Sequence, residues 1–453
     1  MFPFHRSKNL KLVLGFLQFL KDLLFGNKKK LHIISRFILE GLAPATHRGY
    51  INYLTMSREY VRENHLSTRT NDFSGIKHFI NDDMPDADKI KEYSDHLDNF
   101  ESTFSGLKYY DIGRMIMLNT DGLYISFKGT ADYLTNTECN NNENQLGLNL
   151  SYGTNTCVMD RGNEYFNINP VWDYAYLPGT TSYQLGNIEN IGTTDPETNY
   201  DKYLSESDKM IVKIKSPEEK YYKDGMYDKH LPAATEKNGF YYGGGYDKEK
   251  GVAYLMQRSC HHEENNFTVT CIATKDGMVL LGADLGYTGE ITEDGTLFQK
   301  NSRKLHTTIE QTFTKLNQTQ LSEDNKELTV GNALYRTLDN HNISFTDRHS
   351  LVGHWKRNHT EVTADKQVET PNIFIAYIDH DLDREHAKYA YSIQHKNHKD
   401  EKFELVHNFD GNKVQEVKLP DGTVAIAAYE NVNNYQTSKG TTINLVKGDF
   451  KLI

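Results

Sequence analysis

Polar and aromatic side chains gather between Glu138 and Gln184 in a pattern suited to binding a sugar. The stretch opens Glu-Cys-Asn-Asn-Asn-Glu-Asn, so carboxylates and carboxamides fall within seven residues. Asparagine side chains favour local turn bonds over helix, and we expect residues 138–144 to form a loop or a strand end. Trp172 follows, one of two tryptophans in the chain. It could offer a stacking surface to a sugar, or it could anchor the core of a β domain.

Arg58 and Arg62 form a second group with chemical potential. At a spacing of four residues, both guanidinium groups leave the same face of a helix, where they could bind one anionic group. The alternative is a solvated pair on a surface helix, with Glu59 and Glu63 as counter-charges. The residues by themselves leave both interpretations open.

Metal and redox chemistry have little support in the sequence. His261-His262-Glu263-Glu264 contains metal-ligand types, but adjacent histidines of a strand point to opposite faces, so we expect a loop and no metal site. The four cysteines, Cys139, Cys157, Cys260 and Cys271, form no CxxC pair and fit free thiols or at most two bridges. We expect no cofactor, and no pattern supports a structural Ca²⁺.

Composition limits the classes of protein that fit. A chain of 453 residues predicts two or three domains. The net charge of −11 disfavours general nucleic-acid binding, although one cleft can still be basic. No apolar run is long enough to cross a bilayer. The most apolar run, Leu10–Phe25, is interrupted by Lys21-Asp22 and has no cleavage site after it, so a buried helix is favoured over a signal peptide.

Helical periodicity extends from residue 8 to about 103. The expected helices are Leu10–Phe25, Leu31–Glu40, Tyr50–Asn64 and Asp88–Phe104. Gly41 and Pro44 should end the second of them. This region predicts antiparallel helix pairs.

The period then changes to that of strands. Arg114–Ser126 alternates around Asp121-Gly122, which predicts a hairpin. Further strands are expected near Met210–Ile214, Gly251–Met256, Phe267–Ala273, Met278–Gly282, Asn372–Ile378 and Thr423–Ala428. Lys275-Asp276-Gly277 and Pro420-Asp421-Gly422 are turn signals between such runs. The region predicts antiparallel β structure in stacked sheets, with residues 216–237 as a surface excursion.

These motifs, in this order, resemble polysaccharide lyase family 8, which contains the hyaluronate, chondroitin and xanthan lyases. The most specific are Glu138-Cys-Asn-Asn-Asn-Glu-Asn144 and Glu164-Tyr-Phe-Asn-Ile-Asn-Pro-Val-Trp-Asp-Tyr-Ala-Tyr-Leu-Pro-Gly-Thr-Thr181. Other matching stretches are Gly41–Tyr50 followed by Ser57–Arg62, Tyr242–Asp247 with Gly251-Val-Ala, Gly353-His-Trp355, and Phe374–His380 with Lys388-Tyr-Ala-Tyr391. The resemblance covers nearly the whole chain.

The resemblance implies an α+β multidomain protein: a remnant of an (α/α) toroid over 1–103, a large antiparallel β super-sandwich over 104–395, and a small C-terminal β domain over 396–453. It also implies β-elimination at a uronic acid of an acidic polysaccharide. Arg58, Arg62 and Glu138 would be catalytic, and Asn141 and Trp172 would bind substrate. For Glu138 and Asn141 the alternative is a polar turn. Asp379-His380 is interpreted as structural.

One departure from the family pattern concerns the proton-transfer groups. The family places a Tyr, a His and an Asn well upstream of the paired arginines, but only 57 residues precede Arg58. His5 and His47 lie in sequence that does not match. We therefore expect a fragment of a longer lyase, or alternatively a non-catalytic carbohydrate-binding β-sandwich protein. By family, the protein would be exported and would act as a monomer on a glycosaminoglycan such as chondroitin or hyaluronan. The sequence does not identify the polysaccharide.

Overall fold

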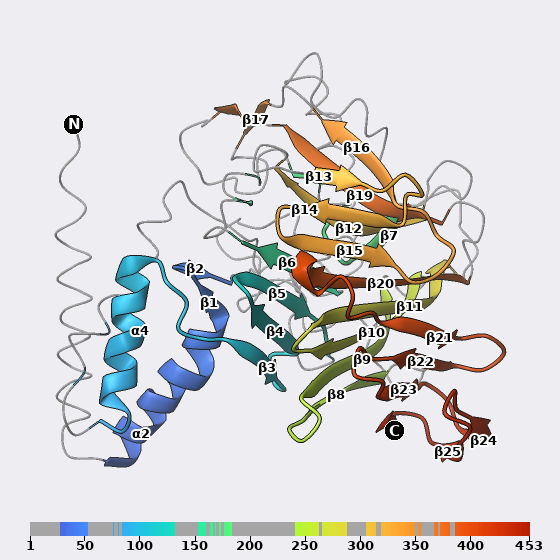
Figure 1. Cartoon of the computed structure of the whole chain (residues 1–453), viewed down its shortest axis with the longest axis horizontal. Coiled ribbons are helices and arrows are strands. Elements are labelled where there is room, and N and C mark those ends of the chain that lie inside the picture. The colour runs from blue at the N-terminus through green and yellow to red at the C-terminus, as the bar shows by residue number, and fades with distance from the viewer. Residues whose placement is uncertain are drawn as a thin grey trace, which may run out of the picture. The chain divides into compact units, whose positions relative to one another are not determined.

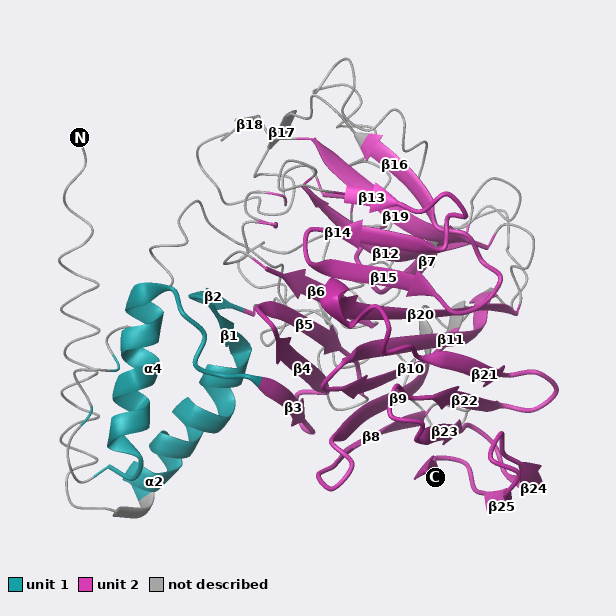
Figure 2. Ribbon diagram, in the orientation of Figure 1, with its two compact units in different colours: residues 1–51, 65–105 teal, residues 52–64, 106–453 magenta. Residues whose placement is uncertain are grey.

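The computed structural model describes a large part of the chain. The described residues are 28–52, 76, 80, 84–131, 153–159, 164–165, 168, 172–173, 176–183, 241–261, 265–287, 305–313, 319–348, 352–354, 367–369, 372–380 and 386–453. The expected helix Leu10–Phe25, the expected strand Met210–Ile214 and the excursion 216–237 lie outside them. Two compact units are formed, residues 1–51 with 65–105 and residues 52–64 with 106–453 (Figure 2).

The first unit is helical. Its elements are α2 (Lys28–Arg36), a π-helical turn η1 (Phe37–Leu42), a 3₁₀ turn η2 (Ala43–Ala45), the short strands β1 (Thr46–His47) and β2 (Tyr50–Ile51), and α4 (Ala87–Asn99). Ile90, Tyr93 and Leu97 lie on one face of α4 and pack with Leu31 and Ile38 in a small apolar core. No helix among the described residues is long and apolar enough to span a membrane.

The expected helices that reach the described residues all differ in extent from the observed elements. Leu31–Glu40 is covered by α2 and η1, and Gly41 does not end it as expected, because the π-helical turn runs through Gly41 to Leu42. The segment expected as Asp88–Phe104 ends at Asn99, because Phe100 adopts a left-handed conformation with φ 58° and its N–H caps the last turn. The expected helix Tyr50–Asn64 is wrong at its start: Tyr50–Ile51 pairs with Thr46–His47 as a β-hairpin. Arg48 and Gly49, both with positive φ, make that turn. Residues 53–64 lie outside the described residues.

The second unit is built from antiparallel sheets (Figure 1). The eight-stranded sheet has the order β13 (Thr319–Leu321), β14 (Glu327–Val330), β15 (Ala333–Thr337), β20 (Ala387–His395), β11 (Gly277–Tyr287), β10 (Asn265–Thr274), β9 (Val252–His261) and β8 (Tyr241–Asp247). The four-stranded sheets are β3 (Gly106–Tyr110), β4 (Met115–Thr120), β5 (Leu123–Lys128) and β6 (Thr154–Val158); β16 (Ser344–Arg348), β19 (Ile373–Asp379), β12 (Leu305–Phe313) and β7 (Thr181–Tyr183); and β21 (Glu404–Asn408), β22 (Val414–Lys418), β23 (Val424–Ala428) and β26 (Phe450–Leu452). Two-stranded ladders join β17 (Val352–His354) to β18 (Gln367–Glu369) and β24 (Val432–Gln436) to β25 (Thr442–Leu445), and η11 (Lys396–His398) follows β20.

The centre of the eight-stranded sheet is buried on both faces. Along β11, Met278 and Leu280 belong to the largest core cluster, whereas Val279 and Leu281 belong to a second cluster on the opposite face. Side chains alternate across a strand, so β11 separates two apolar layers. The first layer includes residues of β4, β5 and β12, and the second includes residues of β22 and β23. The stretch Met278–Leu281 of β11 therefore appears in the sequence as a continuous apolar run.

The expected strands in the described residues are confirmed to within a few positions. β9, β10, β11, β19 and β23 cover the five predicted runs. The hairpin of β4 and β5 turns at Asp121-Gly122, where both residues have positive φ, as a two-residue hairpin requires. Residues 396–453 fall in the same compact unit as the sandwich. The domain bounds 104–395 and 396–453 stay a prediction.

Candidate functional site

Four of the five predicted site residues lie outside the described part of the chain: Arg58, Arg62, Glu138 and Asn141. The segments that carry them begin at described positions. Asn52 precedes the arginines, and Ala131 precedes Glu138. The site is therefore built from these two attachment points and from the sheet that holds them.

Asn52 fixes the start of the arginine segment to the sheet of β3–β6. Its carboxamide is fully buried and donates to the Tyr124 hydroxyl at 3.3 Å and to Ser126 Oγ at 2.7 Å. Tyr124 and Ser126 lie on β5, on the face opposite Ile125, whose side chain belongs to the core cluster. Ser126 also bonds to Thr156 on β6. One face of this sheet thus completes the core, while the other provides a polar attachment for residue 52.

Ala131 follows the end of β5, where two buried cations lie. Lys128 donates from Nζ to the Gly113 carbonyl oxygen at 2.6 Å, and Arg114 donates to the carbonyl oxygens of Gly243 and Met256. Burial first, and then the charge of Arg114, lowers the pKa of Lys128 to about 8. Sequence reasoning missed both residues, because a lysine and an arginine at strand ends look like solvated charges.

Trp172, the fifth predicted residue, is fully buried. Its ring lies 6.4 Å from that of Tyr165, centroid to centroid. A ring with no exposed surface cannot stack on a sugar, so the structure favours the core-anchor alternative and we correct the substrate-binding role accordingly.

The motif around Trp172 forms a clasp, defined here as Asp173 together with residues 176–180. Gln311 on β12 accepts from the Asp173 N–H and donates to the carbonyl oxygens of Asp173 and Tyr176. Gly179 donates to the Thr308 carbonyl oxygen at 2.8 Å, and the Pro178 carbonyl oxygen accepts from the N–H of Asn155 on β6. The clasp therefore ties β6 to β12, and its specific sequence has a structural explanation.

Gly179 is required in the clasp for two reasons. Its φ of +86° is left-handed, and a Cβ there would lie 2.2 Å from the Gly153 carbonyl oxygen. Glycine thus allows the backbone at residue 179 to approach that at residue 153 more closely than any residue with a Cβ could.

The pKa of the Glu310 carboxylate is raised, and the side chain is enclosed. Its oxygens accept from the Tyr165 and Tyr335 hydroxyls and from the Gln311 N–H. Burial raises its pKa to about 7, with a further contribution from Glu164. At 1% exposure it has no access to a polysaccharide, so this is a structural polar cluster rather than a catalytic acid.

Other buried titratable groups also have structural explanations. His380 is buried, contacts Thr307 Oγ1 through Nε2 at 2.8 Å, and has its pKa lowered to about 3 by burial, which agrees with the structural interpretation of Asp379-His380. Burial raises the pKa of Tyr124, so its hydroxyl stays neutral. Cys157 and Cys271 are free, buried thiols. No cluster of three potential metal ligands occurs among the described residues.

Comparison with known proteins identifies this class of fold. The family model described as "Polysaccharide lyase family 8, super-sandwich domain" matches residues 105–404, well over half of the chain. A chain with stacked antiparallel sheets and this match is a super-sandwich protein. It belongs to polysaccharide lyase family 8. A search of curated protein sequences found no match.

Solved structures share the fold at low sequence identity. A chondroitinase AC lyase studied with oligosaccharides has a TM-score of 0.66 at 18% identity, covering 94% of this chain and 58% of that one. The Streptomyces coelicolor A3 chondroitin AC lyase, in complex with chondroitin sulphate, gives 0.60 at 14%, with coverages of 86% and 53%. A Paenibacillus xanthan lyase gives 0.57 at 12%, with coverages of 90% and 39%. The present chain thus spans a little over half the length of these two chondroitin lyases.

Proposed function

We propose that this protein takes part in β-elimination at a uronic acid of an acidic polysaccharide, such as chondroitin or hyaluronan. The family membership of residues 105–404 carries the proposal. Two solved proteins of the same fold are described with oligosaccharides or with chondroitin sulphate. The ordered motifs containing Arg58, Arg62, Glu138 and Asn141 add to this support.

The reaction sets clear demands on the site. The proton on C5 of a uronate is weakly acidic while the neighbouring carboxylate keeps its full charge. Donors or cations must take up charge as the enolate-like state forms. A base must remove the proton and an acid must protonate the leaving oxygen. Arg58 and Arg62 would meet the first demand, because paired guanidinium groups bind and neutralise a carboxylate.

The attachment points allow these groups to share one surface. Arg58 follows Asn52 by six residues, about 20 Å of extended chain, and Glu138 follows Ala131 by seven, about 25 Å. Asn52 and Ala131 are both linked to β5: Asn52 donates to Ser126, and Ala131 closely follows the end of that strand. Glu138 would then orient an arginine, and Asn141 would donate to a sugar hydroxyl.

The division of the molecule follows from the same proposal. Residues 1–103 would form part of an incomplete (α/α) toroid, 104–395 the super-sandwich and 396–453 a C-terminal β domain. The resemblance stated above does not extend to the Tyr, His and Asn that the family uses for proton transfer. We therefore assign this chain the anion-binding part of the reaction. We also propose that it is exported and monomeric, which fractionation of the producing cell and light scattering would test.

The test is a pair of measurements on the purified 453-residue chain. Calorimetry with a chondroitin sulfate hexasaccharide should show binding that weakens at least about tenfold in Arg58→Ala and in Arg62→Ala. Lys418→Ala is the matched control, because it removes a cation of β22, which belongs to a different sheet from β3–β6. Unchanged affinity in both arginine variants would rule out the assigned roles.

The second measurement follows the absorbance of unsaturated uronate. Under this proposal the chain should release very little, because the resemblance assigns it no group for proton transfer. Strong turnover would contradict this division of labour. The alternative, a non-catalytic carbohydrate-binding protein, predicts the same binding but no cleavage by any longer product of the same gene.

A further inference from the structure

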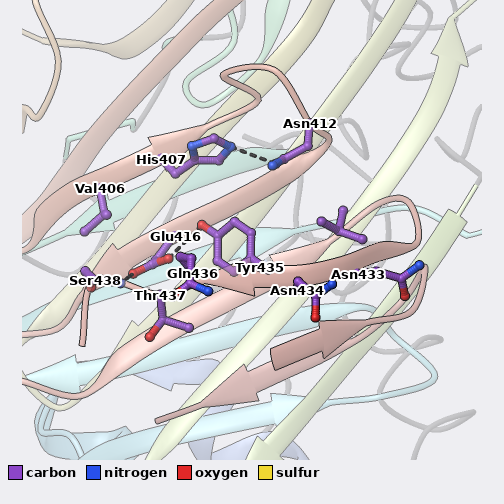
Figure 3. Close-up of a pocket in the computed structure, with 11 residues that line it drawn as sticks. Val406, His407, Asn412, Glu416, Asn433, Asn434, Tyr435, Gln436, Thr437 and Ser438 are labelled. Atoms are coloured by element: carbon purple, nitrogen blue, oxygen red, sulfur yellow. Dashed lines mark hydrogen bonds between the residues drawn. The ribbon is translucent and has the colours of Figure 1, made fainter. Parts of the chain in front are cut away.

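The C-terminal sheets contain a groove that the proposed reaction does not use. It lies between β21, β22 and β24, and Figure 3 shows its lining side chains. Its volume is about 470 Å³. This volume is within the range of about 300–1,000 Å³ that is typical of small-molecule sites. Its lining residues are Val406, His407, Asn412, Glu416, Val432, Asn433, Asn434, Tyr435, Gln436, Thr437 and Ser438.

The lining is rich in groups that bond to hydroxyls. Four carboxamides and two hydroxyl-bearing aliphatic residues face it, beside the rings of His407 and Tyr435. Val406, with 43% of its surface exposed, adds an apolar contact. Amides that both donate and accept suit a ligand whose own groups do both.

Hydrogen bonds join the side chains at the floor of the groove. Glu416 is fully buried, and its carboxylate accepts from the Tyr435 hydroxyl at 2.7 Å and from the Ser438 N–H at 2.8 Å. His407 Nε2 and Asn412 Oδ1 are 2.8 Å apart, which fixes a second side chain of the rim (Figure 3). These bonds hold the groove in shape before any ligand arrives, which lowers the entropy cost of binding.

A β-bulge turns two carboxamides towards the solvent at the mouth. The register of β24 with β25 shifts between Val432 and Tyr435. Asn434 adopts a left-handed φ of 55° there, and its N–H donates to Asn444 Oδ1. Asn433 and Asn434 are exposed, and no hydrogen bond of the Asn433 side chain is found within the described residues. Bulges commonly redirect side chains beside binding sites.

The charges of the lining select the class of ligand. It contains no lysine or arginine, and both oxygens of its carboxylate, Glu416, are already bonded. An acidic sugar would therefore find no cation in the lining to pair with its charge. A neutral pyranose needs only hydrogen bonds, which the amides can supply. A peptide would need more apolar or charged side chains than this lining contains.

We propose that this groove is a second carbohydrate site, specific for a neutral, hydroxyl-rich sugar. It would hold a neutral glycan while the arginine site binds the acidic chain. The assignment depends on the groove alone and stands or falls separately from the proposed elimination reaction.

The experiment is calorimetric titration of the full chain with three probes: a trimer of N-acetylglucosamine, a trimer of galactose and a chondroitin sulfate hexasaccharide. At least one neutral trimer should bind. Asn433→Ala and Asn434→Gly should each weaken that binding by about tenfold, since each removes bonds to the sugar. Asn434→Gly keeps the left-handed backbone, so its thermal unfolding should stay close to that of the parent.

Two controls keep the result specific. Asn397→Ala removes an exposed carboxamide away from the groove and should leave the neutral-sugar affinity unchanged. Arg58→Ala should affect the acidic probe and leave the neutral one alone. The proposal is overturned if neither neutral trimer binds, if the groove variants bind as the parent does, or if only the acidic probe depends on Asn433 and Asn434.

Discussion

Glu310 shows how a single buried residue makes the sandwich sensitive to pH. Its carboxyl group has an ordinary pKa of 4.5, which burial raises to about 7 in the fold. Between these values the native state holds a proton that the unfolded chain has released. This contribution to stability is therefore fully present below pH 4.5 and is lost as the pH rises through 7.

Replacing Glu310 by Gln should remove this dependence. The amide keeps an acceptor for the Tyr165 and Tyr335 hydroxyls but cannot titrate. Denaturant unfolding at several pH values should show the parent losing free energy of unfolding relative to Glu310→Gln, by a few kcal/mol between pH 4.5 and 8. His380, whose pKa is lowered to about 3, changes stability in the opposite sense but equally in both proteins. Parallel pH profiles would contradict a raised Glu310 pKa.

Asn52 is the residue through which the sheet should control the arginine segment. Asn52→Ala removes two bonds to β5 and should lower the free energy of unfolding by about 1–3 kcal/mol. It should also weaken binding of a chondroitin sulfate hexasaccharide, because the segment that carries Arg58 loses its attachment. Thr423→Ala, which breaks an exposed bond to Asp421, serves as the control and should change neither quantity by a comparable amount. Reduced stability with unchanged affinity would remove Asn52 from the site.

At the scale of elements, the clasp between β6 and β12 should be sensitive to substitution at Gly179. Gly179→Ala combines a left-handed backbone with a Cβ placed 2.2 Å from the Gly153 carbonyl oxygen. Gly422 has a similar φ of +83° but nothing within 4 Å of an added Cβ. Gly422→Ala should therefore cost only about 1–2 kcal/mol of backbone strain, whereas Gly179→Ala should cost clearly more. Equal losses in denaturant titrations would show that the clasp yields without strain.

Strands and turns could be predicted from the sequence because their signals are local. Asp121-Gly122 and Pro420-Asp421-Gly422 carry the turn chemistry, and alternating apolar residues mark the flanking strands. The expected helix starting at Tyr50 failed because the left-handed turn at Arg48-Gly49 and pairing with β1 outweigh the apolar spacing.

The candidate site was less accessible to such reasoning. Sequence spacing suggests that Arg58 and Arg62 act together, but it contains no information on Asn52, whose proposed role rests on contacts with residues 72 and 74 positions further on. The role of Trp172 could not be predicted, because the residue type alone does not distinguish a buried tryptophan from one that is exposed to a sugar. Similarly, the groove at Asn433 and Asn434 depends on a bulge that only the pairing of β24 and β25 reveals.

At the scale of the whole second unit, the eight-stranded sheet is shared between two apolar layers. Val279 and Leu281 of β11 contact the cluster that contains Val417 and Leu419 from the C-terminal region. These contacts should couple the stability of residues 396–453 to that of the sandwich. The coupling can be measured by tryptophan fluorescence. Trp172 and Trp355 both lie outside the C-terminal region, so their signal reports unfolding of the remainder of the chain.

Leu419→Ala tests this coupling. Leu419 is 1% exposed, and its truncation should cost about 2–5 kcal/mol, shifting the unfolding midpoint observed by tryptophan fluorescence. Val446, which is 59% exposed, supplies the control, and Val446→Ala should shift it by less than about 0.5 kcal/mol. An unchanged fluorescence midpoint in Leu419→Ala, with a separate transition by circular dichroism, would show that the C-terminal region unfolds on its own.

The central claim is that Arg58 and Glu138 belong to one anion-binding surface beside β5. A double-mutant cycle with Arg58→Ala and Glu138→Gln, read as the affinity for a chondroitin sulfate hexasaccharide, tests this most directly. Groups in one site should show a coupling energy above about 0.5 kcal/mol, whereas groups more than about 10 Å apart add independently. We predict clear coupling together with a loss of affinity in each single variant. Strictly additive effects, or binding that neither substitution changes, would contradict the account.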